Sequence, residues 1–146
     1  MGGIVKLHVV GIVCVSVTAC APGIAIPVPT PSAPPKPASE IMNAAAVTPR
    51  DGAGAIFVTR DKQLRDMRCT YDISLDGQVV AGLRTGEQVT IYADPGRRIV
   101  GVVIRGEASC DPALAQVPVQ VVASATTKIR VWADHSYDLR IESTTY

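Results

Sequence analysis

The strongest constraint on the fold is an alternation of apolar and polar side chains with a period of two. It recurs in five runs, residues 72–76, 78–83, 88–93, 128–133 and 137–142. Because successive side chains of a β-strand point to opposite faces of the sheet, this alternation predicts strands that are buried on one face only. The run at 98–104 (RIVGVVI) is apolar on both faces, which predicts a central strand.

Short turn motifs separate the predicted strands. Asp76-Gly77 is typical of a two-residue hairpin, because a type I′ turn requires a positive φ at both central positions. Further turns are expected at residues 84–87, at 94–97, where Pro95-Gly96 suits a type II turn, and at 134–136. Seven or eight short strands joined in this way predict an all-β fold, a small antiparallel β-sandwich.

Three segments depart from the regular alternation. Pro118 lacks an amide hydrogen and so predicts an edge strand or a bulge. Asp111-Pro112 suits the cap and first position of a helix, which predicts one helical turn over residues 111–116. Residues 39–46 have a short helical pattern with Ser39 as the N-cap. An isolated helix of this length is unstable in water, so it either packs on the folded domain or frays, and we expect it to fray.

The first twenty residues have the pattern of a secretory signal, with an ordinary buried helix as the alternative. Lys6 supplies a positive charge, and residues 7–17 are almost wholly apolar but too short to cross a hydrocarbon core of about 30 Å. Residues 17–20, Val-Thr-Ala-Cys, resemble the lipobox of bacterial lipoproteins, which implies that Cys20 receives the lipid. Cys14 is a poorer acceptor, because a bulky valine precedes it where the peptidase requires a small residue.

A proline-rich stretch follows the lipobox. Residues 21–37 hold seven of the eleven prolines of the chain, a composition that favours an extended spacer; a partner-binding proline motif is the alternative. The residue after the cysteine is Ala21 and not aspartate, and this resembles the sorting pattern of outer-membrane lipoproteins. The predicted organisation is a signal peptide at 1–19, a lipidated and disordered linker at 20–51 and a β-sandwich at 52–146.

Cys69 and Cys110 are the two thiols that remain after signal cleavage and lipidation. In an oxidising compartment they have one pairing, and we expect a disulfide that joins the start of the second strand to the end of the central strand. The alternative is a redox-active pair, but catalytic pairs need close spacing and a lowered pKa.

Residues 52–61 (GAGAIFVTRD) and 73–102 (ISLDGQVVAGLRTGEQVTIYADPGRRIVGV) resemble a small bacterial lipoprotein domain. The shared features are an opening strand that ends in arginine, an Asp-Gly hairpin with a Gly-Leu step, and a Pro-Gly turn that leads into a strand. That domain is similar to PEGA domains, compact β-sandwiches of envelope proteins. The resemblance covers residues 52–103, with a weaker match at 134–142, and implies a fold rather than a shared activity. Arg98 departs from the pattern, which often has histidine there.

Composition argues against several classes of function. A net charge of +1 and few aromatic residues disfavour a nucleic-acid partner. His135 is the only histidine left after processing, so we expect no metal and no cofactor. Residues 134–136 hold an Asp, a His and a Ser, but adjacent turn positions cannot converge as a catalytic triad. Asp72 and Asp76 would lie about 13 Å apart along a strand, too far for a typical acid–base pair. The chain is therefore not expected to be an enzyme.

The remaining candidates for function are surface residues. Residues 60–68 form a segment of mixed charge between the first two predicted strands, whose cations are Arg60, Lys62, Arg65 and Arg68. We expect a solvated loop, and docking on an acidic partner or on lipid head groups is the alternative. Trp132 lies between Val131 and Ala133 in an alternating run, where it is either a core residue or an exposed anchor for a protein partner.

These features predict an outer-membrane lipoprotein anchored through the lipid on Cys20. Its β-sandwich would serve in the periplasm as a structural or docking subunit of an envelope or secretion assembly. The alternative function is binding of an envelope polysaccharide such as peptidoglycan, for which Trp132, Tyr92 and Tyr137 are the available aromatic residues.

Overall fold

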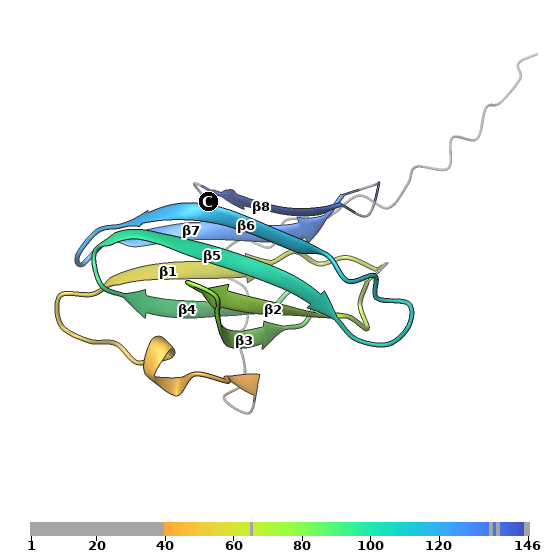
Figure 1. Cartoon of the computed structure of the whole chain (residues 1–146), viewed down its shortest axis with the longest axis horizontal. Helices are drawn as coiled ribbons and strands as arrows, with labels where there is room; N and C mark the ends of the chain where they lie inside the picture. Colours follow the sequence, from red (N-terminus) through yellow and green to blue (C-terminus); the bar gives the residue numbers. More distant parts are fainter. Residues whose placement is uncertain (1–39, 65, 135, 137, 145–146) are drawn as a thin grey trace, which may run out of the picture.

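The computed structural model describes residues 40–64, 66–134, 136 and 138–144, which form a β-sandwich of two four-stranded sheets (Figure 1). The first sheet has the order β4-β1-β7-β8, with β1 at Gly54–Arg60, β4 at Gln88–Ala93, β7 at Thr126–Ala133 and β8 at Leu139–Ser143. The second has the order β3-β2-β5-β6, with β2 at Thr70–Leu75, β3 at Gln78–Leu83, β5 at Gly96–Arg105 and β6 at Leu114–Val121. The predicted fold class is confirmed.

Most neighbouring strands are antiparallel, as predicted. β2 and β3 pair around Asp76 and Gly77, whose φ angles of 49° and 84° are the positive values that a type I′ turn requires. β5 lies between β2 and β6, so the run that is apolar on both faces does form a central strand. Pro118 belongs to β6, an edge strand, and lies opposite Ile99 of β5. The expected edge position is therefore confirmed.

One strand pair is parallel and brings together the two ends of the folded region. β1 pairs antiparallel with β4 on one side and parallel with β7 on the other, where Arg60 lies opposite Val131. β1 is therefore central in its sheet although it is the first strand in sequence. Alternation does not distinguish a parallel neighbour from an antiparallel one, and the sequence did not predict this pair.

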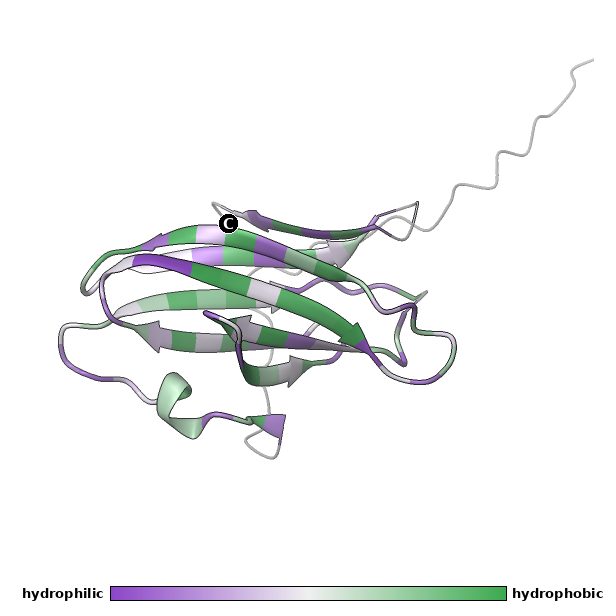
Figure 2. Ribbon diagram, viewed as in Figure 1, coloured by the Kyte–Doolittle hydropathy of each residue, from purple (hydrophilic) through white to green (hydrophobic). Residues whose placement is uncertain are grey.

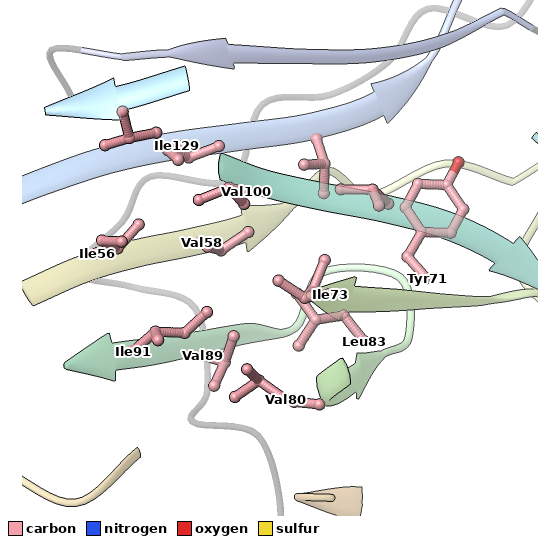
Figure 3. Packing of buried hydrophobic residues seen from close by; sticks show 14 of the residues in the cluster. Ile56, Val58, Tyr71, Ile73, Val80, Leu83, Val89, Ile91, Val100 and Ile129 are labelled. Carbon is pink, nitrogen blue, oxygen red and sulfur yellow. The ribbon is translucent and has the colours of Figure 1, made fainter. Parts of the chain in front are cut away.

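The inward faces of the two sheets form the core. Ile56 and Val58 of β1 are fully buried and lie between the sheets with Val100 of β5 and Ile129 of β7 (Figure 3). The middle of β5 is hydrophobic and its ends are hydrophilic, as expected for a strand that crosses the core and emerges at both sides (Figure 2). Tyr71 of β2 places its ring at one end of this core, close to the loop that follows β1.

The helical turn that we predicted over residues 111–116 is wrong. β6 begins at Leu114, which lies opposite Val103 of β5, and the Ile104 amide donates to the Ala113 carbonyl at 3.0 Å. Pairing with β5 from Leu114 onward gives this part of the segment regular backbone hydrogen bonds, which a single isolated turn of helix would not provide.

The fraying that we expected for residues 39–46 is also wrong for the part that the structure describes. Ile41 forms a β-bridge with Ala81 at the edge of β3, and the Met42 amide donates to the Val80 carbonyl at 2.8 Å. A 3₁₀-helix, η3, follows at Ala44–Val47, and Asn43 rather than Ser39 caps it. The helix is short, but its apolar residues pack against the core, and this packing stabilises it.

The predicted signal peptide, Cys14, Cys20 and the proline-rich stretch lie outside the described residues, as do Ser39, Arg65, His135 and Tyr137. In the described part of the chain, no helix is both long enough and apolar enough to cross a membrane.

Candidate interaction site at the loop between β1 and β2

Arg60, the last residue of β1, is fully buried, so our expectation that it lies on a solvated loop is wrong. Its Nη1 donates to the carbonyl oxygens of Cys69 and Leu83 at 2.7 and 2.9 Å, and its Nη2 donates to the Asp66 carbonyl at 2.7 Å. The planar guanidinium can satisfy several carbonyls at once because its donors lie in a fixed fork. Arg60 therefore holds the described part of the loop that follows β1, through Asp66 and Cys69, from inside the protein.

The charge of Arg60 is compensated where it lies. Its Nη2 is 3.3 Å from an Asp66 carboxylate oxygen, and its guanidinium lies 3.8 Å from the centre of the Tyr71 ring. The Tyr71 hydroxyl donates to the same carboxylate. Burial lowers the pKa of Arg60, and Asp66 opposes this effect. Burial and the hydrogen bond to Asp66 raise the pKa of Tyr71, so its phenol stays protonated.

The first half of the loop is fixed to β7. Asp61 is fully buried, its amide donates to the Val131 carbonyl at 3.0 Å, and its carboxylate pairs with Arg130, whose Nε is 2.7 Å from the nearer oxygen. The Gln63 side chain exchanges two hydrogen bonds with the backbone of Ala133, at 2.5 and 3.0 Å. These contacts extend the parallel pairing of β1 and β7 beyond the end of β1.

A disulfide fixes the other end of the loop. Cys69 and Cys110 are bonded, with their Cα atoms 5.7 Å apart, as the sequence predicted. Gly106 lies in the bend that returns the chain to Cys110, with a φ of 153°. A Cβ atom at this position would lie 2.6 Å from the Cys110 sulfur, so the bend requires glycine.

The outer side of this fixed loop is apolar and cationic. Leu64 is 89% exposed and Met67 is 51% exposed, and Lys62 and Arg68 are exposed beside them. We name these four residues the loop tip. Both anions of the segment, Asp61 and Asp66, face inward and are paired with arginine. The charges that remain on the described surface of the loop are therefore positive.

Trp132 lies next to the loop on the outward face of β7. Its neighbour Val131 is fully buried, whereas Trp132 is partly exposed, and the Arg130 guanidinium lies 4.6 Å from its ring centre. Trp132 is thus neither a core residue nor a fully exposed anchor. Arg130 joins it to the loop, because the same side chain binds Asp61.

The structure therefore brings Lys62, Arg68 and Trp132 to one end of the sandwich and assigns Arg60 an internal role. The sequence prediction missed Leu64 and Met67, although two large apolar residues in a charged segment were a visible signal. Among the described residues, no three potential metal ligands come together. The arrangement can support binding through apolar contact and positive charge.

Comparisons with known proteins add no assignment: no protein-family model and no curated protein matches this chain. The resemblance to PEGA-type domains stays a prediction.

Proposed function

We propose that this protein is an outer-membrane lipoprotein, anchored through Cys20, whose β-sandwich acts as a docking subunit of an envelope or secretion assembly. The lipobox-like residues 17–20 and the proline-rich spacer support the anchor. The loop tip is the observation that carries the docking role. The partner surface would be acidic and would accept the side chains of Leu64 and Met67.

The fixed loop supports this proposal through preorganisation. An exposed leucine gains nothing for folding, but binding it in a partner's pocket removes apolar surface from water, at about 25 cal/mol per Å². Ordering a mobile loop on binding would offset much of that gain. Arg60, Gln63 and the disulfide hold this loop before any partner arrives, so the binding free energy is not spent on ordering it.

The docking role can be tested with a photo-crosslinking amino acid placed at position 64 of the full-length protein in living cells. We expect one defined adduct, which mass spectrometry would identify. Gln120, an exposed residue of β6, is the control position and should give no such adduct. Replacing both loop apolar residues, Leu64→Ser with Met67→Ser, should abolish copurification of that partner without lowering thermal stability. Equal labelling from positions 64 and 120 would argue against a docking loop.

The anchor has its own test. Cells fed a labelled fatty acid should incorporate it into the protein, and Cys20→Ser should abolish the label. Cys14→Ser is the matched control and should leave labelling unchanged. Label that survives in the Cys20→Ser variant would refute the proposed acceptor.

A second candidate function, binding of an envelope polysaccharide, is favoured by the placement of three aromatic residues. Phe57 of β1, Tyr92 of β4 and Trp132 of β7 all lie partly exposed beside buried strand neighbours, and so they share the outward face of one sheet. Aromatic rings on an open sheet face can contact the apolar faces of sugar rings. Sedimentation with purified peptidoglycan sacculi tests this candidate, and Trp132→Ala should reduce the bound fraction. A protein that stays in solution rules it out.

A further inference from the structure

A cavity of about 290 Å³ lies at the opposite end of β1 from the loop tip. The chain before β1 arches over the open side of the sandwich between β3 and β4, and the cavity is the space beneath this arch. Its lining residues are Asn43, Ala45, Ala46, Arg50, Leu75, Gln78, Val80 and Tyr92. The arch is attached at both ends, by the bridge from Ile41 to Ala81 and by an ion pair from Arg50 to Asp94 at 2.9 Å.

The lining combines an apolar wall with hydrogen-bond donors. Leu75, Val80 and the two alanines are the apolar members of the lining, and Tyr92 is its aromatic member. The polar residues are Arg50, Asn43, Gln78 and Tyr92, and none of the described lining residues is acidic. Such a lining favours a ligand that presents oxygen acceptors and a negative charge.

Among the described lining residues Arg50 alone is charged, and it is placed to bind an anion. Its Nη1 pairs with Asp94, while its Nη2 makes only a long contact of 3.5 Å with the Tyr92 carbonyl. The side chain is 47% exposed, so its remaining donors are accessible. The Asn43 side-chain oxygen is occupied by the Ala46 amide at 3.2 Å, which leaves the Asn43 NH₂ group to donate to a ligand.

We propose that this cavity binds a carboxylate-bearing small molecule the size of a monosaccharide or a dipeptide. The carboxylate would pair with Arg50, the amides of Asn43 and Gln78 would donate to neutral oxygens, and the apolar part would contact Leu75 and Tyr92. Envelope material offers this chemistry in two forms, an acidic sugar and the free carboxyl end of a short peptide. The site is independent of the loop tip and goes beyond the docking function.

Calorimetric titration of the purified full-length protein in mild detergent tests the site with two probes and their neutral counterparts. The acidic sugar is N-acetylmuramic acid, compared with N-acetylglucosamine, and the peptide is alanyl-alanine, compared with its carboxyl amide. We expect saturable binding of at least one acid and much weaker binding of its neutral counterpart. The acid that binds identifies the form of the ligand.

Arg50→Gln should weaken that binding about tenfold or more, because it removes a charge-assisted hydrogen bond. Arg105→Gln is the matched control, since Arg105 is 49% exposed and likewise paired with one aspartate, Asp72, but lies at the far end of β2 from the cavity. The Arg105→Gln variant should bind the acid as tightly as the unchanged protein does. The proposal is overturned if neither acid binds, if the neutral counterparts bind equally well, or if the two variants behave alike. None of these outcomes affects crosslinking from position 64, so the cavity proposal can fail while the docking proposal stands, and the reverse.

Discussion

Replacing Arg60 with methionine tests whether the buried guanidinium holds the loop between β1 and β2. The variant removes three hydrogen bonds, to the carbonyls of Asp66, Cys69 and Leu83, and leaves the Asp66 carboxylate without its cation. Removing one partner of a buried ion pair costs about 3–5 kcal/mol. Methionine fills most of the space, so little is added for a cavity. With an m-value of about 1.5 kcal/mol per M, the urea midpoint should fall by about 2–3 M.

Urea unfolding followed by circular dichroism measures this effect. Arg105→Met is the control, because Arg105 is half exposed and its single ion pair contributes at most about 1 kcal/mol. Arg60→Lys should give an intermediate loss, since an ammonium keeps the charge but cannot form the fork of hydrogen bonds. If Arg60→Met unfolds within about 1 kcal/mol of the unchanged protein, as an ordinary surface variant would, the guanidinium does not hold the loop.

Three further predictions follow from the same structure. Replacing Cys69 and Cys110 with serine frees a loop with a sequence separation of 41 residues. Because the unfolded chain gains loop entropy without the crosslink, the free energy of unfolding should fall by about 4 kcal/mol. An unchanged urea midpoint would contradict this prediction. The raised pKa of Tyr71 means that the folded state keeps a proton which the unfolded state releases near the ordinary value of 10.0. Stability should therefore be retained below that pH and lost as the pH rises beyond it, and Tyr71→Phe should remove this component from a series of unfolding curves. Asn43→Ala should cost about 1 kcal/mol of local stability in η3, seen as faster hydrogen exchange at the Ala46 amide; unchanged exchange there would mean that Asn43 is not the cap.

The sandwich could be predicted from sequence because its signals are local. The alternation in residues 88–93 and 128–133 follows from strand geometry alone, and Asp76-Gly77 fixes a hairpin through backbone conformation that few other residue pairs adopt. The parallel pair of β1 and β7 could not be predicted in this way. It depends on which distant strand completes the sheet, and that choice is made by packing of the whole core.

The same distinction separates the correct and incorrect parts of the site prediction. Lys62 and Arg68 are exposed, as expected for charged residues in a connecting segment. Arg60 has the same charge and lies in the same segment, yet it is buried, because carbonyl groups from the loop and from β3, together with Asp66, surround it in the folded state. These partners are either distant from Arg60 in the sequence or are backbone carbonyls, which a sequence pattern cannot identify as partners. The expected helix at 111–116 failed for the same reason, since β5 supplies hydrogen bonds that no local pattern reveals.

The parallel pairing of β1 with β7 has a consequence for how the chain acquires its structure as it emerges, amino end first, from the ribosome. β1 is among the first strands to appear, but its neighbour at Thr126–Ala133 appears only near the end. Until then the edge of β1 that pairs with β7 has no neighbouring strand. Such long-range pairing makes folding slow, and in the meantime it leaves exposed an unpaired strand edge that can aggregate with other chains. A chain cut short before residue 126 would keep that edge open for good, so the last strands act as the closing step that protects the first.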